Sequence, residues 1–126
     1  MLADTYAGNL TSKDGPDSTL DRIAWYRATA ADDSTHRVGK KQPNAFGLYD
    51  VLGNVFEWTD APFRAYPGGR LVAGTPGSSQ AETLKVLRGG AIDTGPAASR
   101  ASYRYRLHPS YTSYNIGFRI ARSLVT

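Results

Sequence analysis

The sequence contains no cysteine. A disulfide, a thiolate nucleophile, a cysteine-ligated zinc ion and an iron–sulfur cluster within the chain are therefore excluded. No apolar run approaches the about 18 residues that a membrane-spanning helix needs. The first five residues, Met1–Thr5, have neither the basic region nor the apolar region of a signal peptide. We expect a soluble protein without membrane insertion, and the compartment stays open because a chain without cysteine tolerates either redox environment.

The excess of positive over negative charge is also small, since the formal net charge is only +4 over 126 residues. This balance permits an acidic partner but does not demand one. The 13 glycines, seven prolines and eight tyrosines favour a turn-rich chain over a helical bundle. We predict a single domain over residues 1–126, in the α+β class, with short strands separated by long irregular loops that carry the function.

Local patterns predict a few short elements. The middle of the stretch before Gly53 is compatible with one helical turn ended by that glycine, where a positive φ is favourable. Alternation predicts that Phe56 and Trp58 share one face of a strand. The other predictions are a buried strand or packed turn at 23–26, a loop at 60–80, a strand at 84–88 and a final strand at 116–122.

Three blocks together resemble one family. They are Pro-Asn-Ala-Phe-Gly-Leu-Tyr-Asp leading into Gly-Asn-Val-Phe-Glu-Trp at 43–58, Val-Leu-Arg-Gly-Gly at 86–90, and Asn-Ile-Gly-Phe-Arg at 115–119. Their order and spacing are similar to those of formylglycine-generating enzymes, also called sulfatase-modifying factors. The resemblance implies a C-type-lectin-like fold. It also implies that the family's N-terminal half is missing, so the chain is a fragment, a pared-down version, or a protomer completed by a partner or by oligomerisation.

The enzymes of this family oxidise a sulfatase cysteine with copper held by two cysteines. The positions that match those cysteines are Ser102 and Leu107. A hydroxyl and an isobutyl group cannot supply two thiolates to a soft Cu(I) ion, so we expect no copper and no catalytic residue. The alternative to a non-catalytic protein is a member of this oxidase family that is inactive or that depends on a missing partner half.

The resemblance also implies a structural calcium ion in the first block. Its ligands would be the carboxylates of Asp50 and Glu57 and the backbone carbonyls of Gly53 and Val55. Calcium takes about six to eight oxygen ligands, which a tight turn and two carboxylates can help to supply. In the alternative interpretation, Asp50 caps a local turn and Glu57 pairs with an arginine. Retention of both carboxylates and the glycine favours calcium.

The segment from 91 to 115 contains no Lys, Glu, Gln, Met or Trp. Those are the residues that NNY codons, in which N is any nucleotide and Y is a pyrimidine, cannot encode. Such codons arise where variable proteins of diversity-generating retroelements, whose lectin-like domains are related to this family, are mutated. Chance is the alternative. We take diversification, and with it a prokaryotic or viral origin, as a working hypothesis, with candidate ligand-binding residues Ile92, Asp93, Thr94, Tyr103, Tyr105, Leu107, His108, Tyr111, Ser113 and Tyr114.

These residues suit recognition, because tyrosine provides a rigid amphipathic contact surface and serine and threonine provide adaptable hydrogen bonds. The predicted function is a non-catalytic binding module that displays residues 92–114 to a protein or other macromolecule. Tyr103 and Tyr105 could instead be core, since they alternate with arginines. The modest charge and the lack of a nucleic-acid motif argue against nucleic acid as the partner. The fold is expected to rest on Phe46, Leu48, Trp58, Leu87, Ile116 and Phe118.

Overall fold

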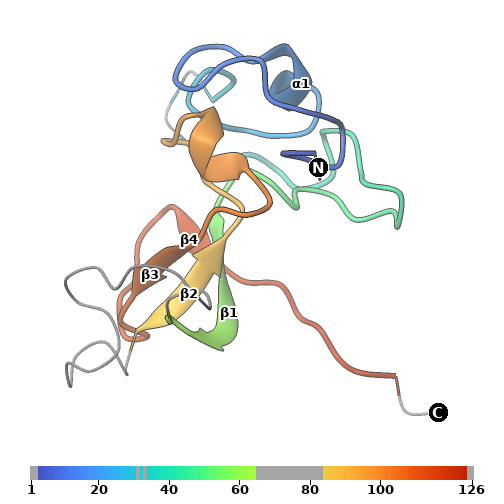
Figure 1. The fold of residues 1–126 in the computed structure, drawn as a ribbon. Coiled ribbons are helices and arrows are strands. Elements are labelled where there is room, and N and C mark those ends of the chain that lie inside the picture. The colour runs from blue at the N-terminus through green and yellow to red at the C-terminus, as the bar shows by residue number, and fades with distance from the viewer. Residues whose placement is uncertain (1–2, 31, 33, 65–83, 125–126) are drawn as a thin grey trace.

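A computed structural model describes residues 3–30, 32, 34–64 and 84–124. Its four strands form one sheet in the order β3-β2-β1-β4, with β1 and β2 at the centre (Figure 1). The β1–β2 and β2–β3 pairs are antiparallel, whereas β4 runs parallel to β1. No helix among the described residues is long and apolar enough to cross a membrane. The elements are α1 (Ser18–Asp21), β1 (Phe56–Pro62), β2 (Lys85–Arg88), η2 (Pro96–Ser99), β3 (Tyr105–Leu107) and β4 (Ile116–Gly117).

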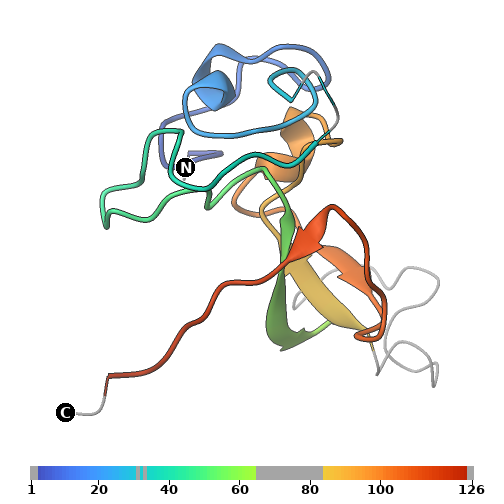
Figure 2. The same ribbon diagram turned by 180° about the vertical axis from the view of Figure 1, so that it is seen from behind.

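The chain divides into a loop-rich half that holds α1 and η2, and a second half built on the sheet (Figures 1 and 2). Two hydrophobic clusters hold the chain, and the second, under the sheet, also includes Ala98 of η2. Leu20, Ile23 and Tyr26 are buried in the first, whereas Phe56 and Leu87 are buried in the second. Irregular backbone therefore surrounds two small cores, as expected where turns outnumber regular elements.

The loop-rich half is held by a buried carboxylate at the start of α1. Asp17 is fully buried and its side chain accepts backbone N–H groups of Leu20, Ser12 and Thr11. Burial acts to raise the pKa of Asp17, but these hydrogen bonds favour the charged form and the pKa is lowered overall. The single turn of α1 thus begins at a strong N-cap.

A turn with two consecutive positive φ angles joins the two halves. Gly53 and Asn54 have φ angles of 77° and 65°. The Gly53 N–H donates to the Gly89 carbonyl at 2.7 Å, and the Asn54 N–H donates to the Trp25 carbonyl at 2.7 Å. The Asn54 side chain also accepts from the His36 N–H and donates to the His36 carbonyl, at 2.9 and 3.1 Å. This turn links β1, the end of β2 and two N-terminal loops.

The structure confirms the strands predicted around Phe56 and Leu87 and the positive φ of Gly53. The stretch before Gly53 contains a turn at 45–46 and bends at 51–52 but no helix, so the predicted helical turn is wrong. Residues 23–26 form no strand and are mostly buried irregular backbone between two turns. Most of the predicted loop at 60–80 lies outside the described residues. The last strand ends at Gly117 instead of continuing to Arg122, because the chain then runs away from the sheet and meets no strand partner (Figure 1).

Three residues expected to support the fold lie on the surface instead. Phe46 is 88% exposed, Phe118 is 75% exposed and Leu48 is 46% exposed. Phe46 lies in an exposed turn, and Phe118 lies in the extended segment beyond β4, so no described element covers either ring. Trp58 and Ile116 are partly buried against the sheet cluster, as predicted, and Leu87 is fully buried.

The junction turn predicts a strong effect of Gly53→Ala. An added Cβ would lie 2.5 Å from the Trp25 carbonyl oxygen, and the φ angle is one that alanine adopts with strain. Gly47→Ala is the matched control, because Gly47 has nearly the same φ of 78° but nothing within 4 Å of the added carbon. We expect Gly47→Ala to cost about 1–2 kcal/mol, the price of the left-handed conformation alone.

The clash should add about 1–3 kcal/mol for Gly53→Ala. Urea unfolding of both variants measures the difference. Equal losses of unfolding free energy would show that close packing at Gly53 contributes nothing.

Candidate functional site

A cavity of about 270 Å³ opens on one side of the sheet, between β3 and the segment that leads into β4. Six of the ten residues predicted to bind a ligand line it. They come from three separate parts of the chain, namely the turn after β2, strand β3, and the loop between β3 and β4. The lining residues are Phe56, Asp93, Tyr105, Leu107, Tyr111, Ser113, Tyr114, Asn115 and Ile116.

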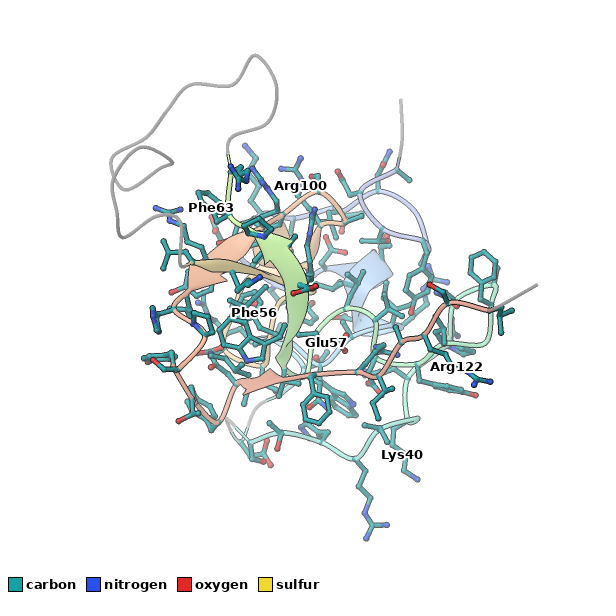
Figure 3. All side chains as sticks on the ribbon, turned by 90° about the horizontal axis from the view of Figure 1, so that it is seen from below. Lys40, Phe56, Glu57, Phe63, Arg100 and Arg122 are labelled. Atoms are coloured by element: carbon teal, nitrogen blue, oxygen red, sulfur yellow. The ribbon has the colours of Figure 1, made fainter. Side chains whose placement is uncertain are left out.

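The sheet register determines which side chains face this cavity. Leu87 pairs with both Trp58 and Tyr105, so these side chains share one face of the sheet. Phe56 pairs with Ile116 on the same face. The Tyr105 ring stacks on Phe56, with ring centroids 5.3 Å apart and an interplanar angle of 25°. Phe56 begins β1, and Phe63 lies beyond the opposite end of that strand (Figure 3).

Asp93 supplies a carboxylate to the cavity wall and is held from several directions. The Asn115 side-chain amide donates to both carboxylate oxygens, at 3.2 and 3.3 Å, and the Tyr114 hydroxyl donates at 3.2 Å. The Asp93 backbone carbonyl accepts from the Arg27 guanidinium at 2.9 and 3.2 Å. Thr94 closes the turn, because its hydroxyl accepts from the Ala91 N–H at 3.0 Å. The carboxylate is therefore positioned in advance of any ligand.

The remaining four predicted residues do not line the cavity. Ile92 is fully buried, so its inclusion in a displayed surface is wrong. The Ile92 side chain lies in the interior, whereas the side chain of the next residue, Asp93, lines the cavity. Thr94 forms the turn itself. Tyr103 is 36% exposed and its carbonyl accepts from Arg88. The His108 imidazole bonds to the neighbouring Ser110 hydroxyl.

Tyr103 and Tyr105 are also not core residues, since Tyr105 is 40% exposed. The alternation that suggested burial instead separates two faces. Arg104 and Arg106 lie with their guanidinium groups 5.0 and 4.7 Å from the centre of the Phe63 ring, away from the tyrosine face. One side of β3 thus carries cation–π contacts, and the other carries the cavity.

Three lining residues were missed by the sequence-based list. Phe56 was predicted as a strand residue and Ile116 as a residue that supports the fold, and neither was predicted to line a binding site. Asn115 was interpreted only as the first residue of the 115–119 block, although its neighbour Tyr114 was on the list. Of the two positions matched to the copper cysteines, Leu107 lines the cavity and Ser102 does not.

The predicted calcium ligands also come together. Asp50, Gly53, Val55 and Glu57 all line a second groove, of about 400 Å³. However, the Glu57 carboxylate is bound at both oxygens by the guanidinium of Arg119, at 2.7 and 2.9 Å.

Arg119 is the cation at the centre of that groove. Its Nη2 atom also donates to the Tyr49 and Asp50 carbonyls, at 2.9 and 3.0 Å. The hydrogen bond to Glu57 raises the pKa of Arg119, and this outweighs the opposing effect of burial. A planar guanidinium matches such a set of oxygens well. The geometry therefore matches the alternative interpretation of the sequence, in which Glu57 pairs with an arginine.

In this arrangement the four residues do not fit a calcium ion. One carboxylate oxygen of Asp50 accepts from the Gly39 N–H at 2.8 Å, and the other is buried without a hydrogen-bond partner. Of the four carboxylate oxygens it alone has no hydrogen-bond partner among the described residues, and the Glu57 charge is already balanced by Arg119. Among the described residues no three His, Cys, Asp or Glu side chains gather in a group that could hold a metal. Calcium binding stays a prediction, with displacement of Arg119 as its condition.

A family model described as the sulfatase-modifying factor enzyme 1-like domain matches residues 4–124. The chain is 33% identical over 101 residues to the serine/threonine-protein kinase pkn1 of Chlamydia pneumoniae, covering 78% of this chain and 16% of that protein. It is 39% identical over 85 residues to the inactive C-alpha-formylglycine-generating enzyme 2 of Mus musculus, covering 64% of this chain and 23% of that protein. The solved structure of Treponema denticola variable protein 1 superposes with a TM-score of 0.59 at 30% identity, covering 79% of this chain and 35% of the other.

The fold and these matches define a domain with a C-type-lectin-like architecture and few regular elements. The chain belongs to the sulfatase-modifying factor family, also known as the formylglycine-generating-enzyme family. It spans less than a quarter of the length of either curated relative and about a third of the variable protein.

The arginine-filled groove predicts how calcium affects stability. We expect wild-type protein to melt at the same temperature in EDTA and in millimolar calcium, because Arg119 already balances the Glu57 charge. Arg119→Gln should melt lower, and calcium should raise the melting temperature of this variant, since its freed carboxylates gain an ion that only the native state binds. Arg122→Gln, in the exposed segment beyond β4, is the control.

Differential scanning fluorimetry measures all three proteins. A wild-type melting temperature that falls in EDTA, together with loss of that sensitivity in Asp50→Ala and Glu57→Ala, would establish the calcium site implied by the family resemblance.

Proposed function

We propose that this chain is a non-catalytic binding module that recognises a macromolecular ligand through the cavity beside β3. The observation that carries the proposal is that six of the predicted binding residues line one cavity. These residues were selected from the sequence alone, in a segment that lacks five residue types. Random positions in an irregular segment would scatter over both faces of the sheet. The binding surface is accordingly narrower than residues 92–114 and excludes Ile92.

The exposed aromatic residues support this proposal. Tyr111 is 52% exposed and Tyr114 is 62% exposed, while Tyr105 keeps 40% of its surface exposed despite stacking on Phe56. Interfaces are enriched in tyrosine because it buries a large rigid surface at a small cost in side-chain entropy. Similarity to a solved structure named as a variable protein agrees with a surface that changes between versions of one scaffold.

A second candidate function is that of an oxidase-family member without its own activity. The name of the mouse relative, an inactive formylglycine-generating enzyme, favours it. The positions of the copper ligands carry Ser102 and Leu107, and the chain has no thiol. The two candidates differ in what they require of the cavity: a binding surface tolerates exchange of its side chains, whereas a remnant of an active site has no such property.

A display library tests the binding surface without knowledge of the ligand. Tyr105, Tyr111 and Tyr114, the exposed residues of the cavity lining, would be randomised together in protein displayed on yeast, and the library would be challenged with protease. We expect most members to stay folded, because substitutions at exposed sites usually change stability by no more than about 0.5 kcal/mol. The matched library randomises the buried residues Ile23, Leu87, Ala91 and Ile92 and should lose most folded members.

Equal losses of folded members from both libraries would show that the cavity residues belong to the core, and the proposal would fail. The expected magnitude in the control is large, since Ile92→Ala alone should cost about 2–5 kcal/mol.

The oxidase candidate has its own test. The purified chain should not convert a sulfatase-type cysteine peptide to formylglycine, with or without copper, because no residue supplies a thiolate. Mass spectrometry of the peptide measures the product against a control without protein. Formation of formylglycine above that control would show that the chain is an enzyme and would contradict the prediction.

A further inference from the structure

We propose that the cavity binds an organic cation, namely a lysine or arginine side chain presented by a protein partner. The inference rests on the proposed binding function and names the chemistry of its ligand. It starts from the charge of Asp93. Among the described residues, the three hydrogen bonds to its carboxylate come from neutral donors, the Asn115 amide and the Tyr114 hydroxyl.

No cationic side chain among the described residues forms an ion pair with Asp93 within 4 Å. Arg27 donates to the Asp93 backbone carbonyl and forms no ion pair with the carboxylate. A fixed, partly buried carboxylate with only neutral partners favours a cationic ligand. A carboxylate also retains capacity for a further donor, because its two oxygens have about four lone-pair sites.

Aromatic rings surround this charge. Tyr105, Tyr111 and Tyr114 line the same cavity, and Phe56 stacks on Tyr105. The faces of such rings carry partial negative charge, which attracts a cation that lies over the ring. Leu107 and Ile116 add apolar wall against which the methylene stem of a long cationic side chain can pack.

The distribution of charge over the sheet points the same way. Arg104 and Arg106 stack near Phe63 on the opposite face, so the net charge of +4 is not concentrated at the cavity. An anionic ligand would meet Asp93 without a compensating cation. A neutral saccharide would use the hydrogen bonds and rings but leave the carboxylate charge without a counterion.

The size of the cavity suits a single side chain. Its volume is about 270 Å³. Pockets for complete small ligands usually enclose about 300–1,000 Å³. A single guanidinium or ammonium group with its stem fits the smaller space, with the rest of the partner lying outside over the exposed rings of Tyr111 and Tyr114.

The proposal is tested with single-residue probes and nuclear magnetic resonance. N-acetyl-arginine methylamide and N-acetyl-lysine methylamide are titrated into isotopically labelled protein, up to about 50 mM because binding of one side chain is expected in the millimolar range. The citrulline and norleucine analogues serve as neutral probes of similar shape. We expect at least one cationic probe to shift the amide signals of Asp93, Tyr111 and Tyr114 saturably, about tenfold more tightly than its neutral analogue.

Two variants and two controls locate the site. Asp93→Asn removes the charge, and Tyr111→Leu removes a ring whose residue is fixed through its backbone N–H to His108. Each should weaken binding of the cationic probe about tenfold or more, equivalent to about 1.4 kcal/mol. Asp60→Asn, at a fully exposed carboxylate paired with Lys85, and Tyr49→Leu, in the arginine-filled groove, should leave binding unchanged. Melting temperatures confirm that each variant is folded.

Failure of this inference can be told apart from failure of the proposed function. If the neutral analogues bind as well as the cations, if Asp93→Asn retains full binding, or if no probe causes a saturable shift, the cationic ligand is ruled out. Saturable binding of a methyl glycoside in place of the cations would assign the cavity to saccharides. In each case the binding surface still stands if the cavity library stays folded, whereas collapse of that library removes both proposals.

Discussion

The turn at Gly53 and Asn54 is the constraint on which the rest of the structure depends. Both residues have positive φ, and a Cβ at Gly53 would collide with the Trp25 backbone. This close approach lets one short turn bond to the Trp25 and Gly89 carbonyls and to the His36 backbone. The Asn54 carbonyl then accepts from the Ile92 N–H at 3.1 Å, which sets the turn that carries the next residue, Asp93, into the cavity.

The sequence predicts those parts of the fold whose cause is local. A glycine at a tight turn and the alternation around Phe56 and Leu87 each have a short-range signature, and the structure confirms them. Strand β3 has only three residues and pairs with β2 through long-range contacts, so the sequence shows no periodicity long enough to predict it. The segment after Gly117 was predicted as a strand but is not one. Its residues alternate clearly, but a strand also needs a neighbouring strand to pair with, and here the chain leaves the sheet.

The site was predictable as a segment but not as a surface. The sequence marks residues 91–115 only by the absence of five residue types, which is a property of composition alone. Whether a side chain points inward depends on turns that composition does not record. Ile92 and Asp93 are neighbours in one turn, yet Ile92 is fully buried while Asp93 lines the cavity. Phe56 and Ile116 complete the cavity from strands that the segment itself does not contain.

The structure also separates the residues that hold the scaffold from those that occupy the site. The scaffold is fixed mainly by backbone hydrogen bonds at Gly53, Asn54 and Ile92 and by Arg119, which binds Glu57 and two carbonyls. Tyr111, by contrast, is tied to its surroundings by a backbone N–H to the His108 carbonyl, which any residue but proline can reproduce. Leu107 lies in a strand that is paired through its backbone, although its side chain also packs partly against the sheet cluster. Such a division lets the side chains of the cavity change their chemistry while the fold stays the same, which is the physical requirement for one scaffold to serve either catalysis or recognition.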